Sequence, residues 1–178
     1  MSIPGKTGSV QGTKPFKVLV DIDLSVRFFG QVLGVRRSPL REVSQVIEFI
    51  RTLSTYKNLQ FAGFMAYEAQ VAGVGDQNRF KKLLSLFLSP FRKWSMRQVK
   101  KKRHEILSAC QRAGIAVEIF NGGGTGTLTW HQDEVNTLTE VTVGSGLLAS
   151  HLFDYYSNFK LQPAAFFALQ AVRSSEPG

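Results

Sequence analysis

The sequence predicts an α/β domain whose parallel strands are joined by helical crossovers, and three observations support this prediction. Short apolar runs alternate along the chain with longer segments of helical periodicity. The 178 residues are enough for one domain with a buried core, and a composition of 43% hydrophobic and 20% charged residues is typical of globular proteins. Element spacing alone leaves two architectures open, half of a doubly wound sheet and half of an eight-stranded barrel.

The first half of the chain predicts two strands with a helix between them. The run FKVLVDIDL at 16–24 is the first strand. Ser38 and Pro39 predict the start of a helix over 39–55, because a hydroxyl N-cap followed by proline is a frequent helix start. The second strand is LQFAGFMAY at 59–67. One face of the expected helix carries Val43, Val46, Ile47, Ile50 and Leu53.

The second half continues the alternation. Pro90 is expected to interrupt the helical pattern before it, and a long helix is expected over 95–113 with Gly114 as its C-terminal cap. The remaining expected elements are strands at 115–120 and 137–143, a short helix at 151–159, and an apolar helix or strand at 163–172.

The net charge of +9 raises the question of nucleic-acid binding, because seven basic residues lie between positions 92 and 103. The same segment has apolar residues at helical spacing, so a helix with a basic solvent face is the favoured interpretation. Trp94 is the single aromatic residue within 92–103, so aromatic residues do not alternate with the charges as a platform for stacking bases would require. Nucleic-acid binding through 92–103 is therefore kept as an alternative and not as the main prediction.

The chain shows no feature of a membrane or exported protein. No stretch approaches the ~20 apolar residues of a membrane span, and the first residues lack the apolar core of a signal peptide. The single cysteine, Cys110, excludes an internal disulfide and lies in a helical pattern, so we expect it to be buried in a protein of the cytoplasm.

Unusual polar and glycine residues follow the expected strands at their C-terminal ends, where both architectures place their sites. The decapeptide NGGGTGTLTW at 121–130 is either a slack linker or a turn that wraps an anion. It matches neither the Walker phosphate loop nor the dinucleotide fingerprint. Glycines that admit close backbone approach, with threonine hydroxyls beside them, favour a phosphate cup, and Gly144-Ser145 after the next strand could grip the same phosphate.

Four segments together resemble a known family: LGVRRSPL, YEAQVAGVGD, NGGGTGTLTW and TEVTVGSGLL. They are similar to the alanine-racemase-like, fold-type III pyridoxal-phosphate enzymes, in the branch of D-threonine aldolase and D-serine dehydratase. Within it, the amino acid deaminase/aldolase subgroup is the most similar. The resemblance runs from about Phe16 to Arg173.

This resemblance implies that the chain is the later part of a (β/α)8 TIM barrel that binds pyridoxal 5'-phosphate at its mouth. It implies a flexible segment at 1–14, a partial barrel at 15–160, and at 161–178 the start of a segment leading to a β-domain that this chain lacks. The implied cofactor-binding residues are Arg37 near the ring oxygen, Tyr67 lining the pocket, and around the phosphate Gly123, Gly124, Thr125, Gly126, Gly144 and Ser145.

The sequence also departs from the family, whose members are roughly twice as long. Their Schiff-base lysine lies on the first barrel strand, and no lysine of this chain falls at a matching position: Lys14 and Lys17 open a strand, and those of 93–102 lie on a helix. We therefore assign no catalytic residue and expect the chain alone to be inactive. His104, His131 and His151 lack ligand spacing, so no metal site is expected and each is taken as an ordinary polar residue.

The function implied by the resemblance is that of a pyridoxal-phosphate-dependent lyase, aldolase or deaminase acting on D- or β-hydroxy amino acids. The alternative is a non-catalytic half barrel that binds a phosphate ligand or self-associates. An amino acid substrate and a homo-oligomer are the expected partners, because a half barrel exposes two sheet edges.

Overall fold

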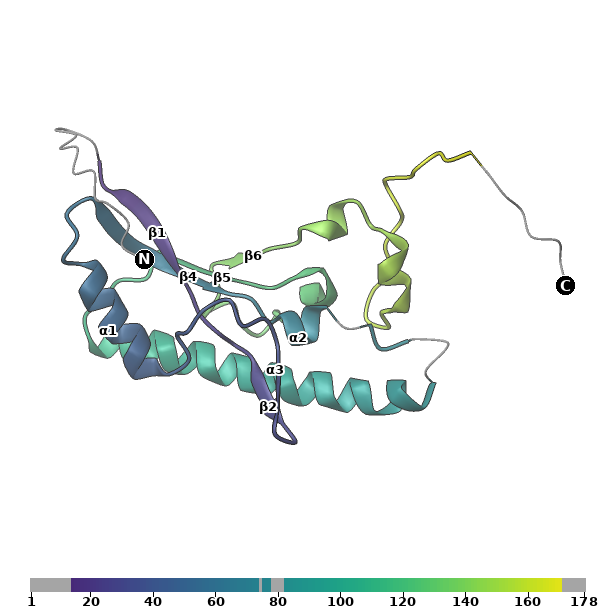
Figure 1. Ribbon diagram of the computed structural model, residues 1–178, viewed down its shortest axis with the longest axis horizontal. Coiled ribbons are helices and arrows are strands. Elements are labelled where there is room, and N and C mark those ends of the chain that lie inside the picture. Colours follow the sequence, from purple (N-terminus) through teal and green to yellow (C-terminus); the bar gives the residue numbers. More distant parts are fainter. Residues whose placement is uncertain (1–13, 74, 78–81, 171–178) are drawn as a thin grey trace, which may run out of the picture.

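The computed structural model describes residues 14–73, 75–77 and 82–170, so most of the segment expected to be flexible at 1–14, and 171–178, lie outside the described residues. A four-stranded sheet has the order β1-β4-β5-β6, and every neighbouring pair is parallel, as the alternation of elements predicted (Figure 1). The strands are β1 (Phe16–Asp21), β4 (Leu59–Ala66), β5 (Ile119–Gly122) and β6 (Glu140–Val141).

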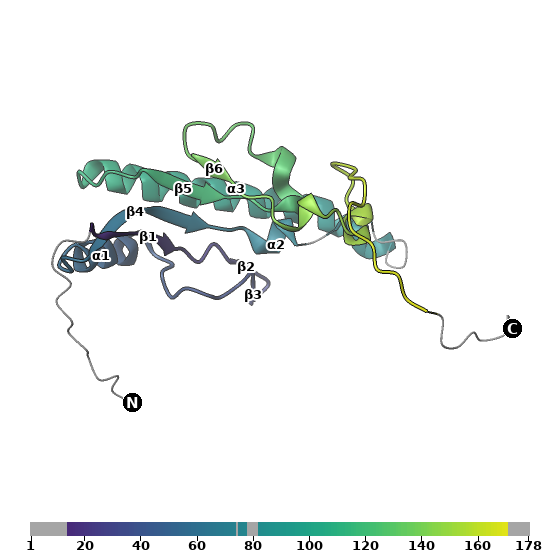
Figure 2. The ribbon, with the colours of Figure 1, turned by 90° about the horizontal axis from the view of Figure 1, so that it is seen from above.

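Two helices pack on one face of this sheet, α1 (Val43–Leu53) and the long α3 (Lys82–Arg112) (Figures 1 and 2). The core between the layers includes Phe64 and Phe120 from the strands, Val46 from α1 and Ile106 from α3. The short helices α2 (Ala69–Ala72), η1 (Thr125–Trp130), η2 (Ser145–Leu147) and η3 (His151–Tyr155) follow the C-terminal ends of the strands.

Helix α1 begins at Val43, so the predicted start at Ser38-Pro39 is wrong. The Ser38 hydroxyl accepts a hydrogen bond from the Leu40 N–H at 3.1 Å and forms a local turn. The cap lies at Glu42, whose N–H donates to Gln45 Oε1 at 3.0 Å. A hydroxyl followed by proline fits a turn as well as a helix, which is why the pattern misled.

Helix α3 runs through Pro90, so the interruption predicted there is wrong. Proline removes one helical hydrogen bond, and packing of the adjacent turn offsets this cost. The rings of Phe91 and Trp94 lie 5.0 and 5.6 Å from that of Phe28. Gly114, at φ +67°, ends the helix as predicted.

Strands β5 and β6 are displaced or shorter than predicted. Residue 115 belongs to the helix cap, because the Ile115 N–H donates to the Cys110 carbonyl at 2.9 Å, and β5 starts only at Ile119. The N–H groups of Thr137 and Leu138 both bond Glu134 O in a turn, which delays β6 to Glu140.

The end of the described chain also differs from expectation. The short helix expected at 151–159 is a single 3-10 segment, η3. Over 163–170 the apolar run forms neither helix nor strand. The antiparallel hairpin of β2 (Val26–Phe28) and β3 (Gln31–Leu33) was not predicted at all.

The basic segment 92–103 does not lie wholly on the solvent face, which corrects that interpretation. Arg92 and Arg103 are fully buried, and Cys110 is buried as predicted. Arg92 lies between the rings of Trp130 and Tyr156, at 4.7 and 5.3 Å from their centroids. The buried face of α3 is a row at helical spacing: Arg92, Met96, Val99, Arg103, Ile106 and Cys110.

Candidate functional site

The sequence-predicted site residues come together where the strands end. The Arg37 guanidinium lies 5.8 Å from the centre of the Tyr67 ring and 3.3 Å from Asp21 Oδ2 at the end of β1. The Tyr67 ring lies against Gly124, where an added Cβ would approach Cε2 to 2.7 Å. These contacts connect the end of β1, the segment between β3 and α1, and the loops after β4 and β5 into one region.

The loops after β5 and β6 are joined by a direct hydrogen bond. The Gly146 N–H donates to the Thr125 hydroxyl at 2.9 Å. Gly144 and Ser145 precede this contact and are exposed. The predicted phosphate residues of the two loops are therefore neighbours.

The glycine run wraps an anion that belongs to the chain itself, the carboxylate of Glu68. The Gly123 N–H donates to Glu68 Oε2 at 3.1 Å, and the Thr127 hydroxyl donates to Oε1 at 2.5 Å. The Gly124 N–H donates to the same Thr127 hydroxyl at 3.2 Å. Two backbone donors of the predicted phosphate cup are thus already used inside the protein.

Glu68 is part of a buried cluster of four charged side chains, each at most 6% exposed. Arg103 from α3 contacts Glu68 and donates to both oxygens of Glu134 at 3.1 Å. His131 places Nε2 3.2 Å from Glu68 Oε1 and Nδ1 2.8 Å from Glu134 Oε2. The expectation that His131 is an ordinary polar residue is wrong, because it joins two carboxylates in the interior.

The cluster balances its own charge. Burial alone would raise the pKa of Glu68, but the hydrogen bond from His131 and the charge of Arg103 outweigh burial and hold that pKa at about 2. Burial would lower the pKa of His131, but the bonds to Glu134 and Glu68 raise it. A protonated His131 gives two positive and two negative groups, which is the condition for burying charge at tolerable cost.

The pKa shifts of Glu68 and His131 predict that the free energy of unfolding is largest at a pH between the titrations of these two groups. Because the folded pKa of Glu68 is depressed, its contribution is present above about 4.5 and is lost as the pH falls toward 2. Because the folded pKa of His131 is raised, its contribution is complete below about 6.5 and is lost as the pH rises through the folded value. Urea unfolding from pH 3 to 9 measures both limbs.

The variant His131→Gln tests the alkaline limb of this profile. It should flatten the loss of stability above neutral pH, and it should also reduce the acid limb, because the hydrogen bond from His131 is the largest contribution that lowers the pKa of Glu68. His151→Gln is the matched control, since the ring of His151 is exposed. An unchanged alkaline limb in His131→Gln contradicts the assignment.

Two backbone donors in the glycine loop remain for an external anion. Thr125 and Gly126 are buried, and no hydrogen-bond acceptor for their N–H groups is found within the described part of the chain. Buried N–H groups without partners are rare, and a bound anion would satisfy them. A Cβ at Gly144 would meet nothing within 4 Å, so there is open space beside this residue in the loop after β6.

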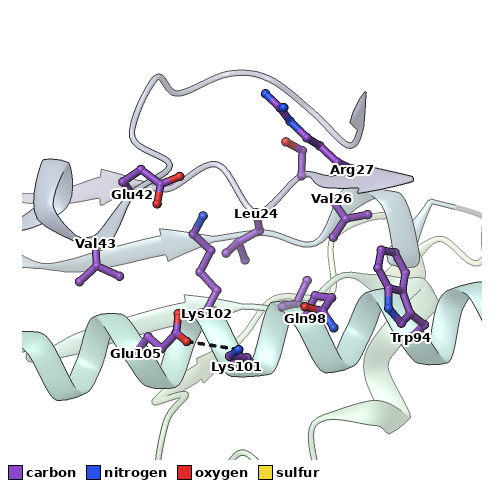
Figure 3. A pocket seen from close by; sticks show the side chains of 12 residues that line it. Leu24, Val26, Arg27, Glu42, Val43, Trp94, Gln98, Lys101, Lys102 and Glu105 are labelled. Atoms are coloured by element: carbon purple, nitrogen blue, oxygen red, sulfur yellow. Dashed lines mark ion pairs between the residues drawn. The ribbon is translucent and has the colours of Figure 1, made fainter. Parts of the chain in front are cut away.

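A separate hollow of about 300 Å³ lies between the start of α1 and α3 (Figure 3). Side chains of positive and negative charge line this hollow, among them Glu42 and Lys102. Lys101 Nζ lies 3.8 Å from Glu105 Oε1. None of the predicted cofactor residues lines it, and we do not assign it to the site.

Lys17 lies in a strand and the lysines of 93–102 lie on a helix, where the sequence placed them. Lys17, early in β1, pairs with Glu118 at 2.5 Å, and Lys100 on α3 pairs with Asp133.

Within the described residues, no group of three or more His, Cys, Asp or Glu side chains is arranged to hold a metal ion. None of the described helices is long and apolar enough to span a membrane.

Sequence reasoning missed the buried cluster. A signal was present for Arg103, which falls at helical spacing between Val99 and Ile106 on the apolar face of its helix. A charged side chain on a buried face needs a partner of opposite charge. Nothing in the sequence identified Glu68, 35 positions away, as that partner.

No family model and no curated protein matches the chain. Among solved structures, the chain shares its fold with D-threonine aldolase from Filomicrobium marinum, with a TM-score of 0.65 and 18% identity over 84% of this chain. Alanine racemase from Bacillus anthracis with bound L-Ala-P gives a TM-score of 0.56 and 17% identity over 87% of this chain. The chain therefore shares the fold of these alanine-racemase-like structures, as predicted.

The chain corresponds to only part of that architecture. It spans about a third of the solved chains it matches, 35% of the first and 34% of the second. Its four parallel strands are accordingly a portion of an eight-stranded barrel, the alternative that element spacing had left open.

Proposed function

We propose that the loops after β5 and β6 bind the phosphate of pyridoxal 5'-phosphate, within a protein related to lyases, aldolases and deaminases of D- or β-hydroxy amino acids. The observation that carries the proposal is the pair of buried, unpartnered N–H groups at Thr125 and Gly126. They lie beside the exposed Gly144-Ser145 turn, to which Thr125 is hydrogen-bonded through Gly146. Similar folds in a D-threonine aldolase and an alanine racemase support the choice of ligand.

The proposed residues divide into holding and positioning groups. Thr125, Gly126, Gly144 and Ser145 would hold the phosphate with backbone and hydroxyl donors. Gly123 and Gly124 shape the loop, since their N–H groups serve Glu68 and Thr127.

Tyr67 and Arg37 would line the ring side of the site. The pKa of the Tyr67 hydroxyl is raised by burial and by the adjacent Glu68, so it stays protonated and able to donate a hydrogen bond. The Arg37 guanidinium, about half exposed, supplies a positive charge beside it. Pyridoxal phosphate, when bound, acts as an electron sink for a carbanion. We propose no catalytic residue in this chain, because we assign none of the lysines in the described ranges to the site.

Titration calorimetry with pyridoxal phosphate, pyridoxal and inorganic phosphate tests the proposal. We expect the two phosphate compounds to bind and pyridoxal to bind at least tenfold more weakly, since charge-assisted hydrogen bonds to phosphate carry the affinity. Gly144→Ala should weaken phosphate binding about tenfold without loss of stability, because its new methyl group enters open space beside the phosphate.

Ser44→Ala on the exposed surface of α1 is the matched control and should bind normally. If pyridoxal bound as tightly as pyridoxal phosphate, the proposal that the two loops bind a phosphate group would be contradicted. If wild type and Gly144→Ala bound phosphate equally well, the phosphate site would not include the Gly144-Ser145 turn.

Self-association is the second candidate property. The edge strands β1 and β6 have no further neighbour in the described sheet, and unpaired edges promote pairing between chains. The nucleic-acid alternative is weakened, because two of the seven basic residues of 92–103 are buried.

A further inference from the structure

Arg92 is a buried cation with unusually few polar partners. Its side chain is fully buried, whereas arginine is almost never buried unless it is paired and hydrogen-bonded. Among the described residues, its Nε and Nη1 have no hydrogen-bond partner. Its Nη2 donates to a backbone oxygen, that of Gly126, at 2.9 Å. A buried polar group left unsatisfied in this way calls for an explanation beyond packing.

The surroundings of Arg92 fix its position and direct its charge. The rings of Trp130 and Tyr156 flank the guanidinium, which restricts where it can move. Its Nη1 lies 3.3 Å from Asp76 Oδ1, as an ion pair without a hydrogen bond. The hydrogen bond from Nη2 therefore brings the positive charge to the carbonyl of Gly126, a residue of the glycine loop.

Two peptide groups connect Arg92 to the N–H of Thr125. The carbonyl of Gly126 belongs to the same peptide group as the Thr127 N–H, and that N–H donates to Gly124 O at 3.0 Å. The Gly124 carbonyl belongs in turn to the same peptide group as the Thr125 N–H. Thr125 is one of the residues proposed to hold the phosphate. A cation thus lies at one end of this chain, and the bound anion would lie at the other.

Such a chain strengthens the donor at its end. Each hydrogen bond polarises the next peptide group, and the gain is about 10–30% per bond. Residues 124–127 are all buried, so water does not screen these bonds. The four residues proposed to hold the phosphate carry no charged side chain, namely Thr125, Gly126, Gly144 and Ser145. A positive charge at the phosphate end of the site must therefore come from another residue.

We propose that Arg92 is a positioning residue of the phosphate site, which makes the Thr125 N–H a stronger donor through the peptide groups that follow Gly124 and Gly126. The inference rests on the proposed function of the two loops and adds the source of their positive charge. Arg92 itself is too deeply buried to touch the ligand.

Calorimetry with inorganic phosphate compares wild type with Arg92→Met and Arg92→Lys. Methionine keeps an unbranched stem but removes the charge and the donor to Gly126, so we expect the affinity to fall about tenfold. Lysine keeps a charge near the Gly126 carbonyl and should restore the affinity to within about threefold of wild type. Tyr156→Phe is the control for lost stability, because it removes the hydroxyl that donates to Ala72 O at 2.8 Å and keeps the ring beside Arg92. Its affinity should be unchanged.

Asp76→Asn supplies a second test, in which Arg92 stays in place. Asparagine removes the negative charge beside the guanidinium, so the affinity for phosphate should rise about threefold. The same variant should unfold at lower urea concentration, because a buried ion pair is lost. Asp133→Asn is the matched control, since it removes a carboxylate that pairs with Lys100 on the surface, and its affinity should stay at the wild-type value. A purely structural role for Arg92 predicts instead that phosphate binding is weaker or equal in Asp76→Asn.

The amide protons of Thr125 and Thr127 report on the chain in the ligand-free protein. Both signals should move to lower frequency in Arg92→Met and stay in place in Tyr156→Phe, because only the first variant removes the polarising charge. A wild type that does not bind phosphate would contradict the proposed function, and this inference with it. Wild-type binding that Arg92→Met matches, or a fall in affinity in Asp76→Asn, would overturn the role of Arg92 alone.

Discussion

Glu68→Ala is expected to lower the free energy of unfolding by about 3–5 kcal/mol, the usual cost of breaking a buried ion pair. The substitution leaves Arg103 and His131 in the interior with Glu134 as their one remaining carboxylate partner among the described residues. It also removes the acceptor of the Gly123 N–H and of the Thr127 hydroxyl. Urea unfolding at pH 6, followed by circular dichroism, measures the loss.

Glu118→Ala is the matched control for this prediction. Its carboxylate pairs with Lys17 on the surface, where side chains are 46% and 58% exposed. Exposed pairs contribute about 0–1 kcal/mol, so this variant should stay close to wild type. A Glu68→Ala protein as stable as Glu118→Ala would mean that the cluster does not hold the glycine loop in place.

Gly126→Ala is expected to disrupt the glycine loop, with a loss of stability of about 3 kcal/mol or more from overpacking. A Cβ at this position would lie 2.0 Å from Ala72 O and 2.5 Å from the Tyr156 ring. The loop would have to shift, because the first of these atoms is backbone. Thermal unfolding measures the effect on stability.

Gly144→Ala provides the contrast, since its added methyl group meets nothing within 4 Å. The two alanine variants therefore separate two reasons for glycine. Gly126 is required by packing against α2, whereas Gly144 leaves room for a ligand. Similar stability of the two variants would contradict this distinction.

Much of the architecture followed from local patterns. The parallel order of β1 and β4 follows from two apolar runs separated by an amphipathic helix, and Gly114 ends α3 at the position its sequence indicated. The hairpin was not predictable in this way, because Phe29 occupies a turn position that phenylalanine rarely takes.

The candidate site was predictable only in outline. Glycine and threonine after β5 indicated an anion, but the sequence could not show that Glu68 takes two of the donors. That outcome depends on packing between α3 and the strand ends, where Arg103 and His131 bring the carboxylate to the loop. Long-range pairing of buried charges leaves no periodic signal in the chain.

Amide chemical shifts of the labelled protein, recorded while inorganic phosphate and then pyridoxal phosphate are added, test the central claim most directly. The account predicts that both ligands shift the N–H signals of Thr125, Gly126, Gly144 and Ser145, while those of Gly123 and Gly124 move less because they remain bonded to Glu68 and Thr127. Shifts confined to the basic residues of α3, with the four loop signals unmoved at saturating ligand, would contradict it.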